Sequence, residues 1–164
     1  MKPTPIEPQD GQESVWEYPR PPRLELTDKQ IRIEFAGQEI ANTTRAYRFL
    51  ETSHPPTYYI PPEDINMEFI QRDKGGSLCE WKGQATYYTI SVNGEKAVRA
   101  AWAYHNPTPE YAEIKDYFAF YAEPMDACYV GGEQATAQPG HFYGGWVTSE
   151  VVGPFKGEPG SWYW

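Results

Sequence analysis

Apolar and polar residues alternate along several short segments of the chain, which is the pattern of half-buried β-strands. Residues 31–35 show this alternation most clearly, and residues 37–38, which begin with glycine, predict a turn into a second strand at residues 39–41. Residues 58–60 and 126–130 predict two further short strands. The pattern therefore favours a mainly β fold.

The strongest local signal is Asn93-Gly94, because this dipeptide between two alternating runs is typical of a two-residue hairpin turn. A two-residue turn here would place Ile90 opposite Ala97, Tyr87 opposite Ala100, and Ala85 opposite Trp102 on the paired strands. One face then alternates aromatic residues with alanines, and consists of Ala85, Tyr87, Val98, Ala100, Trp102 and Tyr104. The other face consists of Tyr88, Ile90, Val92, Ala97 and Arg99.

Helical signals are short. Residues 62–70 begin with proline and acidic residues, which favour a first helical turn, and they place apolar residues on roughly one face. Residues 43–51 predict a brief helix, and residues 108–113 predict a helical turn. Residues 117–121 read as a strand that is apolar on both sides, which predicts a central position in a sheet.

The distribution of proline and glycine divides the chain into three parts. Residues 1–22 form a Pro-rich tail that we expect to be extended and partly disordered, with Trp16 and Tyr18 as surface anchors or as a docking segment for a partner. Residues 23–133 form the β-rich core domain. Residues 134–164 form a tail rich in glycine, proline and aromatic residues, which we expect to pack on the core.

Length and charge narrow the functional classes. The 164 residues suffice for one domain of ordinary size. The formal net charge of −9 repels phosphate backbones and anionic membranes, which argues against nucleic acid and membrane partners. Aromatic residues make up 16% of the chain, more than a small core needs, and aromatic side chains also dominate ligand-binding surfaces.

The two cysteines, Cys79 and Cys128, form no pattern of a disulfide framework. The N-terminus lacks a positive stretch followed by an apolar run, so we expect a cytoplasmic protein. No segment approaches the roughly 18 consecutive apolar residues of a membrane span.

A series of motifs carries a resemblance to a known family. The residues concerned are Arg45, Tyr58-Tyr59-Ile60-Pro61-Pro62-Glu63-Asp64, Ser77-x-Cys79-x-Trp81-Lys82-Gly83, Tyr87, Ala101-Trp102-Ala103-Tyr104, Tyr117-x-Ala119-Phe120-Tyr121 and Asp126. In this order they resemble a bacterial family of domains of unknown function, whose members are sometimes labelled nucleotidyltransferase-like. The resemblance spans about residues 31–132.

The resemblance implies a single β-rich domain in which two small antiparallel sheets meet at an angle, a fold called a β-tent, with one or two short helices. It also implies a pocket near the Cys-x-aromatic-Lys-Gly turn. Other β-tent domains carry zinc on paired cysteines or hold ligands in an aromatic cage. This chain has no Cys-x-x-Cys pair, and it has Glu80 where the family usually has proline, which adds a carboxylate that could partly neutralise Lys82.

The turn and the aromatic face of the hairpin predict a ligand site. Its candidate residues are Arg45, Tyr59, Cys79, Trp81, Lys82, Tyr87, Trp102 and Tyr104. Lys82 beside an aromatic rim suits a carboxylate or phosphate of a ligand, although a solvated lysine is an equally good interpretation. Aromatic residues in a stripe are ordinarily core, but tyrosine hydroxyls need hydrogen-bond partners, and this favours a cavity.

Cys79 is the candidate catalytic residue if Lys82 or His54 stabilises its thiolate; the alternative is a small buried hydrophobe. His54, His105 and His141 lack metal-ligand spacing, so no metal and no cofactor is predicted, although a mononuclear site from His54, His105 and Cys79 stays open. The segment that begins at His54 is interpreted as a stiff extended lead-in to a strand, with a lid over the pocket as the alternative.

Three functions from different classes remain. The leading hypothesis is a small domain that binds an organic, acidic ligand in an aromatic pocket. The second is an enzyme, either a Cys79-dependent transferase or hydrolase, or a nucleotidyltransferase. No Gly-rich phosphate loop and no paired aspartates support the latter. The third is an interaction module that docks a protein partner through the two tails.

Overall fold

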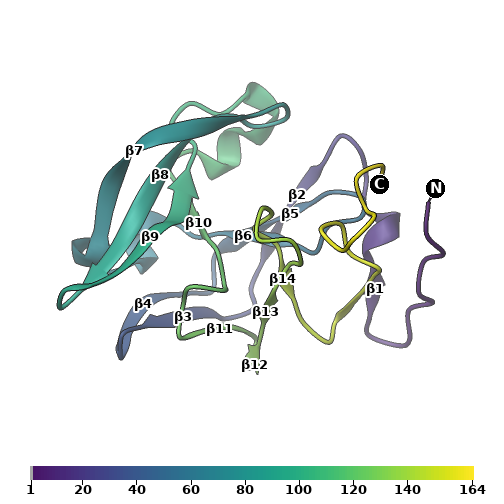
Figure 1. Ribbon diagram of the computed structural model, residues 1–164, viewed down its shortest axis with the longest axis horizontal. Coiled ribbons are helices and arrows are strands. Elements are labelled where there is room, and N and C mark those ends of the chain that lie inside the picture. Colours follow the sequence, from purple (N-terminus) through teal and green to yellow (C-terminus); the bar gives the residue numbers. More distant parts are fainter. Residues whose placement is uncertain (1) are drawn as a thin grey trace.

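Short, mostly antiparallel strands form the framework of the structure, a computed structural model that describes residues 2–164 (Figure 1). The first sheet has the order β10-β9-β8-β7, with β7 Ile70–Cys79, β8 Gly83–Val92, β9 Glu95–Ala103 and β10 Phe118–Phe120. The second has the order β12-β11-β3-β4, with β3 Ile31–Phe35, β4 Gln38–Thr43, β11 Ala127–Val130 and β12 Glu133–Gln134. The third has the order β2-β5-β6, with β2 Arg23–Thr27, β5 Ala46–Leu50 and β6 Thr57–Tyr59.

Two ribbons and four short helices complete the fold. The ribbons pair β1 (Glu13–Ser14) with β15 (Val151–Val152), and β13 (Thr136–Ala137) with β14 (Trp146–Val147). The helices are 3-10 turns, namely η1 Val15–Glu17, η2 Pro62–Asp64, η3 Met67–Phe69 and η4 Pro109–Ile114. None of these helices could cross a membrane, because the longest within residues 2–164 has six residues. The prediction of a mainly β, single-domain fold of small antiparallel sheets is confirmed.

The central hairpin forms as predicted near its turn, but its register changes farther out. Ile90 lies opposite Ala97, as expected from the two-residue turn. A bulge follows, because Arg99 has a φ of +56° and its backbone N–H donates to the hydroxyl of Thr89 (3.2 Å). Tyr87 therefore lies opposite Trp102 and not opposite Ala100, so the predicted register was wrong beyond the bulge.

The bulge also corrects the predicted faces. Ala100 packs in the core cluster of Ile90 and Val92, and the side chain of Val98 is exposed. Ala85, Tyr87, Trp102 and Tyr104 nevertheless share the aromatic face, where they pack with Phe49 and Tyr59 of the third sheet. The register shift by two residues preserves the alternation of faces, so these aromatic residues stay together.

The first hairpin is confirmed, since β3 and β4 pair through a turn in which Ala36 and Gly37 both have positive φ. The helix expected over residues 43–51 is wrong. Residues Ala46–Leu50 form β5, the middle strand of its sheet, and backbone pairing on both edges outweighs the weak helical spacing. The helix expected over residues 62–70 is two separate turns, because Ile65 between them bridges to β4.

The strand expected over residues 117–121 forms as β10, but at the edge of its sheet and not at the centre. The apolar character of this strand therefore does not come from a central position in the sheet. Phe118–Phe120 are all buried, and the free edge of Phe118 exchanges backbone hydrogen bonds with Ile60 at 2.8 and 2.9 Å. The third sheet thus continues across this bridge into the first, and the aromatic face of β8 and β9 lies against β5 and β6.

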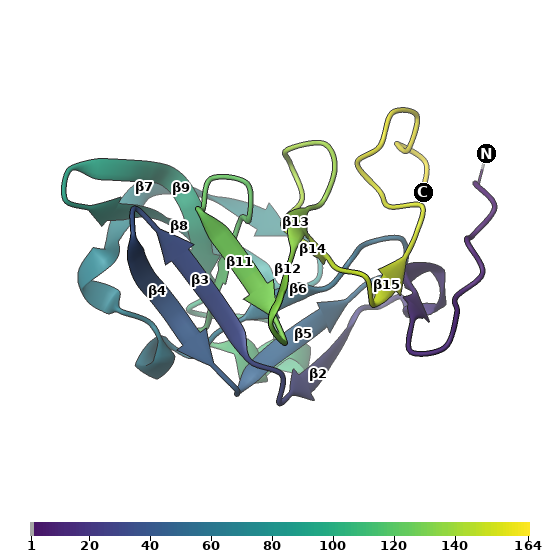
Figure 2. The ribbon, with the colours of Figure 1, turned by 90° about the horizontal axis from the view of Figure 1, so that it is seen from below.

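The segments before β2 and after β12 meet on the same side of the molecule (Figures 1 and 2). β1 and β15 pair in parallel, and the indole nitrogen of Trp16 donates to the carbonyl of Pro154 (2.9 Å). Arg48 of β5 fastens β1 to the sheet, because its guanidinium holds both carboxylate oxygens of Glu13 and one of Glu25. Trp16 and Tyr18 therefore contact the rest of the protein, Tyr18 as a buried residue.

Candidate functional site

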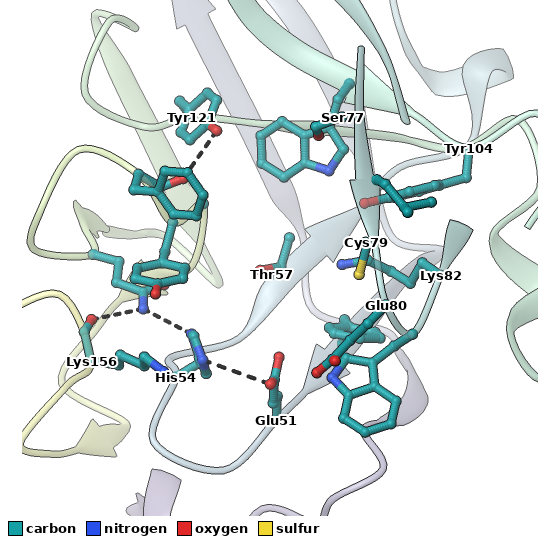
Figure 3. A pocket seen from close by; sticks show the side chains of 18 of the residues that line it. Glu51, His54, Thr57, Ser77, Cys79, Glu80, Lys82, Tyr104, Tyr121 and Lys156 are labelled. Atoms are coloured by element: carbon teal, nitrogen blue, oxygen red, sulfur yellow. Dashed lines mark hydrogen bonds and ion pairs between the residues drawn. The ribbon is translucent and has the colours of Figure 1, made fainter. Parts of the chain in front are cut away.

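A cavity of about 430 Å³ opens on the aromatic face of the first sheet (Figure 3). One wall comes from the end of β7, the turn after it, and the aromatic residues of β8 and β9. The opposite wall comes from the loop after β5 and from residues 138–144 and Lys156 of the C-terminal segment. The cavity lies within the size range of small-molecule sites in proteins.

The turn between β7 and β8 positions Lys82. Cys79 pairs with Gly83 across the hairpin, and Gly83 has a φ of +106°, a conformation that favours glycine. Thr108 fixes the turn from outside, because its hydroxyl donates to the carbonyl of Trp81 (2.7 Å) and its N–H donates to the carbonyl of Lys82 (3.0 Å). The backbone of Lys82 is thus held in place by hydrogen bonds within the protein.

The side chain of Lys82 is the most unusual feature of the cavity. The residue is only 9% exposed, yet within residues 2–164 no carboxylate lies within ion-pair distance of its ammonium group. Three aromatic rings surround the nitrogen instead, with centroids at 3.9 Å (Phe49), 5.3 Å (Tyr104) and 5.5 Å (Tyr59). These ring faces attract the cation but accept hydrogen bonds poorly.

The protonated form of Lys82 is favoured. Burial opposes the charge, but Tyr59, Cys79 and Glu51 favour it, and the pKa of Lys82 is raised above its ordinary value. Glu80 does not neutralise the ammonium group as its position in the sequence suggested, because its side chain is exposed and forms no ion pair with Lys82. Lys82 therefore presents an unpaired positive charge to the cavity.

His54 and Glu51 occupy the opposite wall (Figure 3). The N–H of Gly145 donates to Oε1 of Gln138 (3.0 Å), so the amide nitrogen of Gln138 faces Nδ1 of His54 (3.0 Å). Nδ1 must therefore accept, and the proton of the neutral ring lies on Nε2, 3.8 Å from a carboxylate oxygen of Glu51. Gln138 thus selects one tautomer.

The ionisation of these two groups follows from burial. Burial lowers the pKa of His54 to about 3, with the positive charges of Lys156, Arg20 and Lys82 acting in the same direction. Burial raises the pKa of Glu51, against the opposing effects of Lys82 and Arg20. His54 is consequently a neutral donor at physiological pH and not a cation.

Aromatic rings form the remaining walls, and the hydroxyls of Tyr87 and Tyr121 are already paired. The rings of Trp102 and Tyr121 lie 4.7 Å apart. The hydroxyl of Tyr121 donates to the carbonyl of Phe142 (3.2 Å), and the hydroxyl of Tyr87 bonds to that of Ser77 (2.8 Å). The walls therefore offer ring surfaces more than free hydrogen-bonding groups.

The structure gathers most of the predicted site residues. Those that line the cavity are Cys79, Trp81, Lys82, Tyr87, Trp102 and Tyr104. Tyr59 is fully buried behind the cavity, where it contacts the ammonium of Lys82 and accepts from the indole of Trp102 (3.4 Å). Arg45 lies elsewhere, because its exposed guanidinium is bound to the carboxylate of Asp64.

The residues that sequence reasoning missed come mainly from distant segments. They are Glu51, Thr57, Tyr121, Gln138, Tyr143 and Lys156. His54 also lines the cavity, whereas its segment was expected to be a stiff lead-in to a strand. The aromatic and glycine residues at positions 142–146 were a signal that could have indicated this wall of the cavity. Gly144 lets the backbone lie close to Trp102, because a Cβ at this position would lie 2.1 Å from the Trp102 ring.

The mononuclear site left open between His54, His105 and Cys79 does not form. The imidazole of His105 bridges the hydroxyl of Tyr88 and the carboxylate of Asp116, each at 2.6 Å, outside the cavity lining. No cluster of three or more histidine, cysteine, aspartate or glutamate residues suited to a metal ion is found in residues 2–164.

A comparison with known protein families matches one part of the chain. The model of a family described as a domain of unknown function (DUF427), with a nucleotidyltransferase-like label, matches residues 23–131. No curated protein matches the chain. The matched segment holds the turn with Lys82 and the aromatic face, whereas Gln138, Tyr143 and Lys156 lie beyond it.

Proposed function

We propose that this chain, which belongs to the DUF427 family of domains of unknown function, binds a small organic ligand in the cavity and pairs an acidic group of that ligand with Lys82. One observation carries the proposal. Lys82 is a nearly buried ammonium group that faces a cavity and has no carboxylate partner within residues 2–164. Buried charges in proteins are usually paired, so an anion from outside is the missing partner.

The arrangement of Lys82 suits binding. Thr108 fixes its backbone and the three aromatic rings hold its ammonium group, so little side-chain freedom remains to be lost when an anion arrives. The cavity excludes bulk water on one side, which strengthens an ion pair relative to one on the surface. The site thus combines an orienting charge with an apolar body, the usual composition of a small-molecule site.

Replacement of Lys82 by methionine tests the proposal. Lys82→Met keeps the volume but removes the charge, so we expect the free energy of unfolding to change by less than about 1.5 kcal/mol. Ligand responses should be lost. Thermal shifts with a library of organic acids and neutral metabolites measure both effects, since a ligand at a hundredfold its Kd adds about 2.7 kcal/mol of stability.

The matched control is Lys96→Met, which removes the same charge from an exposed position on β9. It should retain every ligand response of the wild type. Acidic compounds that stabilise Lys82→Met as strongly as the wild type would show that Lys82 does not anchor the ligand. Trp102→Ala gives a second test of the same cavity, because it removes a wall without changing the charge.

A second candidate, a Cys79-dependent transferase or hydrolase, is supported by the position of this thiol in the cavity beside Lys82 (Figure 3). It predicts rapid alkylation of Cys79 by iodoacetamide near neutral pH, measured by peptide mass spectrometry. Cys128 is an internal control, because burial raises its pKa to about 12. If Cys79 stays as inert as Cys128 until the protein is denatured, the enzyme candidate fails.

A further inference from the structure

We infer that the ligand is an aryl carboxylate, a flat aromatic body with one carboxylate group, and not a phosphate, a nucleotide or a sugar. The inference rests on the proposed function and specifies the chemical class that the same cavity would take. Three properties of the cavity support it, namely the balance of its charges, the state of its hydroxyl groups and the character of its rim.

The charges of the cavity favour a single negative charge on the ligand. The charged residues that line it are Glu51, Glu80, Lys82 and Lys156, so the formal charges cancel. The ammonium of Lys156 donates to the backbone carbonyl of Trp164 (2.9 Å), and His54 is neutral. Among the described residues, the ammonium of Lys82 contacts aromatic rings and the Tyr59 side chain but no carboxylate, so it can match one carboxylate of a ligand.

Phosphate groups require more than this cavity offers. Proteins bind them with several N–H donors, most often arginine forks, glycine-rich loops or helix N-termini. No arginine is among the described residues that line the cavity. A phosphate dianion would also approach the carboxylates of Glu51 and Glu80, and only two lysines, Lys82 and Lys156, line the cavity to balance these charges.

The walls favour an aromatic body over a sugar. Sugars are recognised through many hydrogen bonds, but the hydroxyls of Tyr87 and Tyr121 are bonded to Ser77 and to the backbone of Phe142. The surface of the rings stays accessible, including the pair of Trp102 and Tyr121. Flat aromatic groups gain the most from such surfaces, through stacked and edge-to-face contacts.

The rim extends the apolar surface outward. Leu78 of β7 and Phe142 of the C-terminal segment both line the cavity, and they are 78% and 74% exposed. Large apolar side chains with this exposure next to a cavity are typical of ligand-binding grooves. They would contact the end of the aromatic body that points away from Lys82, so the ligand is amphipathic along its length.

A matched set of probes tests the class. Cinnamate, cinnamamide and cinnamyl phosphate share one aromatic body and differ in the head group, and ATP with Mg²⁺ represents the nucleotides. Binding is measured at pH 7 by quenching of tryptophan fluorescence, since Trp81 and Trp102 line the cavity. We expect cinnamate to bind at least tenfold more tightly than cinnamamide, and Lys82→Met to remove that ratio.

The outcomes separate this inference from the proposed function. Tighter, Lys82-dependent binding of cinnamyl phosphate or of ATP with Mg²⁺ overturns the carboxylate class but leaves an anion site at Lys82. Equal binding of cinnamate and cinnamamide also overturns the class. A library that yields a Lys82-dependent ligand of another class, with no response to any cinnamyl probe, refutes the class alone. Ligand responses that are unchanged in Lys82→Met would contradict both the carboxylate class and the proposed anion site at Lys82.

Discussion

Trp146→Ala is expected to lower the free energy of unfolding by about 3–5 kcal/mol, the usual cost of removing a buried indole. Trp146 is 1% exposed and belongs to the largest core cluster. Its indole nitrogen donates to the carbonyl of Phe120 (2.9 Å), and its ring lies 5.3 Å from that of Tyr58. Its loss would leave a large cavity and an unpaired carbonyl in the core.

Urea denaturation followed by far-UV circular dichroism measures the change. Trp162→Ala is the matched control, because the same side chain is 85% exposed and its removal should change stability by less than about 0.5 kcal/mol. A loss below about 1 kcal/mol in Trp146→Ala would mean that the C-terminal segment contributes little to the core. The expected result makes this segment part of the fold, although it lies beyond the residues that match the family.

Acidification from pH 7 to pH 5 should cost about 2 kcal/mol of stability through His54 alone. The pKa of His54 falls from 6.5 to about 3 on folding, chiefly because the ring is buried. Between these two values the unfolded chain binds a proton and the folded protein does not. The contribution is complete above about pH 6.5, and it is lost progressively as the pH falls toward 3.

The comparison of two variants with the wild type isolates this effect. His54→Gln should flatten the pH dependence of the unfolding free energy by about 2 kcal/mol between pH 7 and 5, whatever its effect at pH 7. Trp162→Ala should leave the slope as in the wild type, because the side chain that it removes is 85% exposed and has no titratable group. Glu51 acts in the opposite sense, since its raised pKa stabilises the folded protein as the pH falls, so the slopes are compared between variants. Equal slopes in the wild type and His54→Gln would contradict the prediction.

Local signals predicted the hairpins correctly, because Asn93-Gly94 and Gly37 specify turns with positive φ. They could not predict the bulge at Arg99, since it depends on a hydrogen bond to Thr89 of the neighbouring strand. The strand at residues 46–50 was missed for a related reason. Its two partners, β2 and β6, lie before and after it in the sequence, and pairing with both overrides a weak helical pattern.

Half of the cavity could be predicted from the sequence. The residues from Cys79 to Tyr104 lie on two consecutive hairpins, β7–β8 and β8–β9, so alternation and the turns sufficed to place Lys82 beside the aromatic face. His54 and Gln138 are 84 positions apart, and their hydrogen bond depends on how the C-terminal segment returns to the sheet. Arg45 was included because its neighbours match the family, but Asp64 binds its side chain elsewhere.

The ribbon of β1 and β15 brings together the two segments that flank the family match, and the chain that runs from β12 to β15 covers one side of the aromatic face. A shorter relative that ended near residue 131 would keep Lys82 and Trp102 but lack the covering wall, and it would present an open trough. The cavity of such a chain would therefore be open along one side, while Lys82 and the aromatic face would keep their places at the turn.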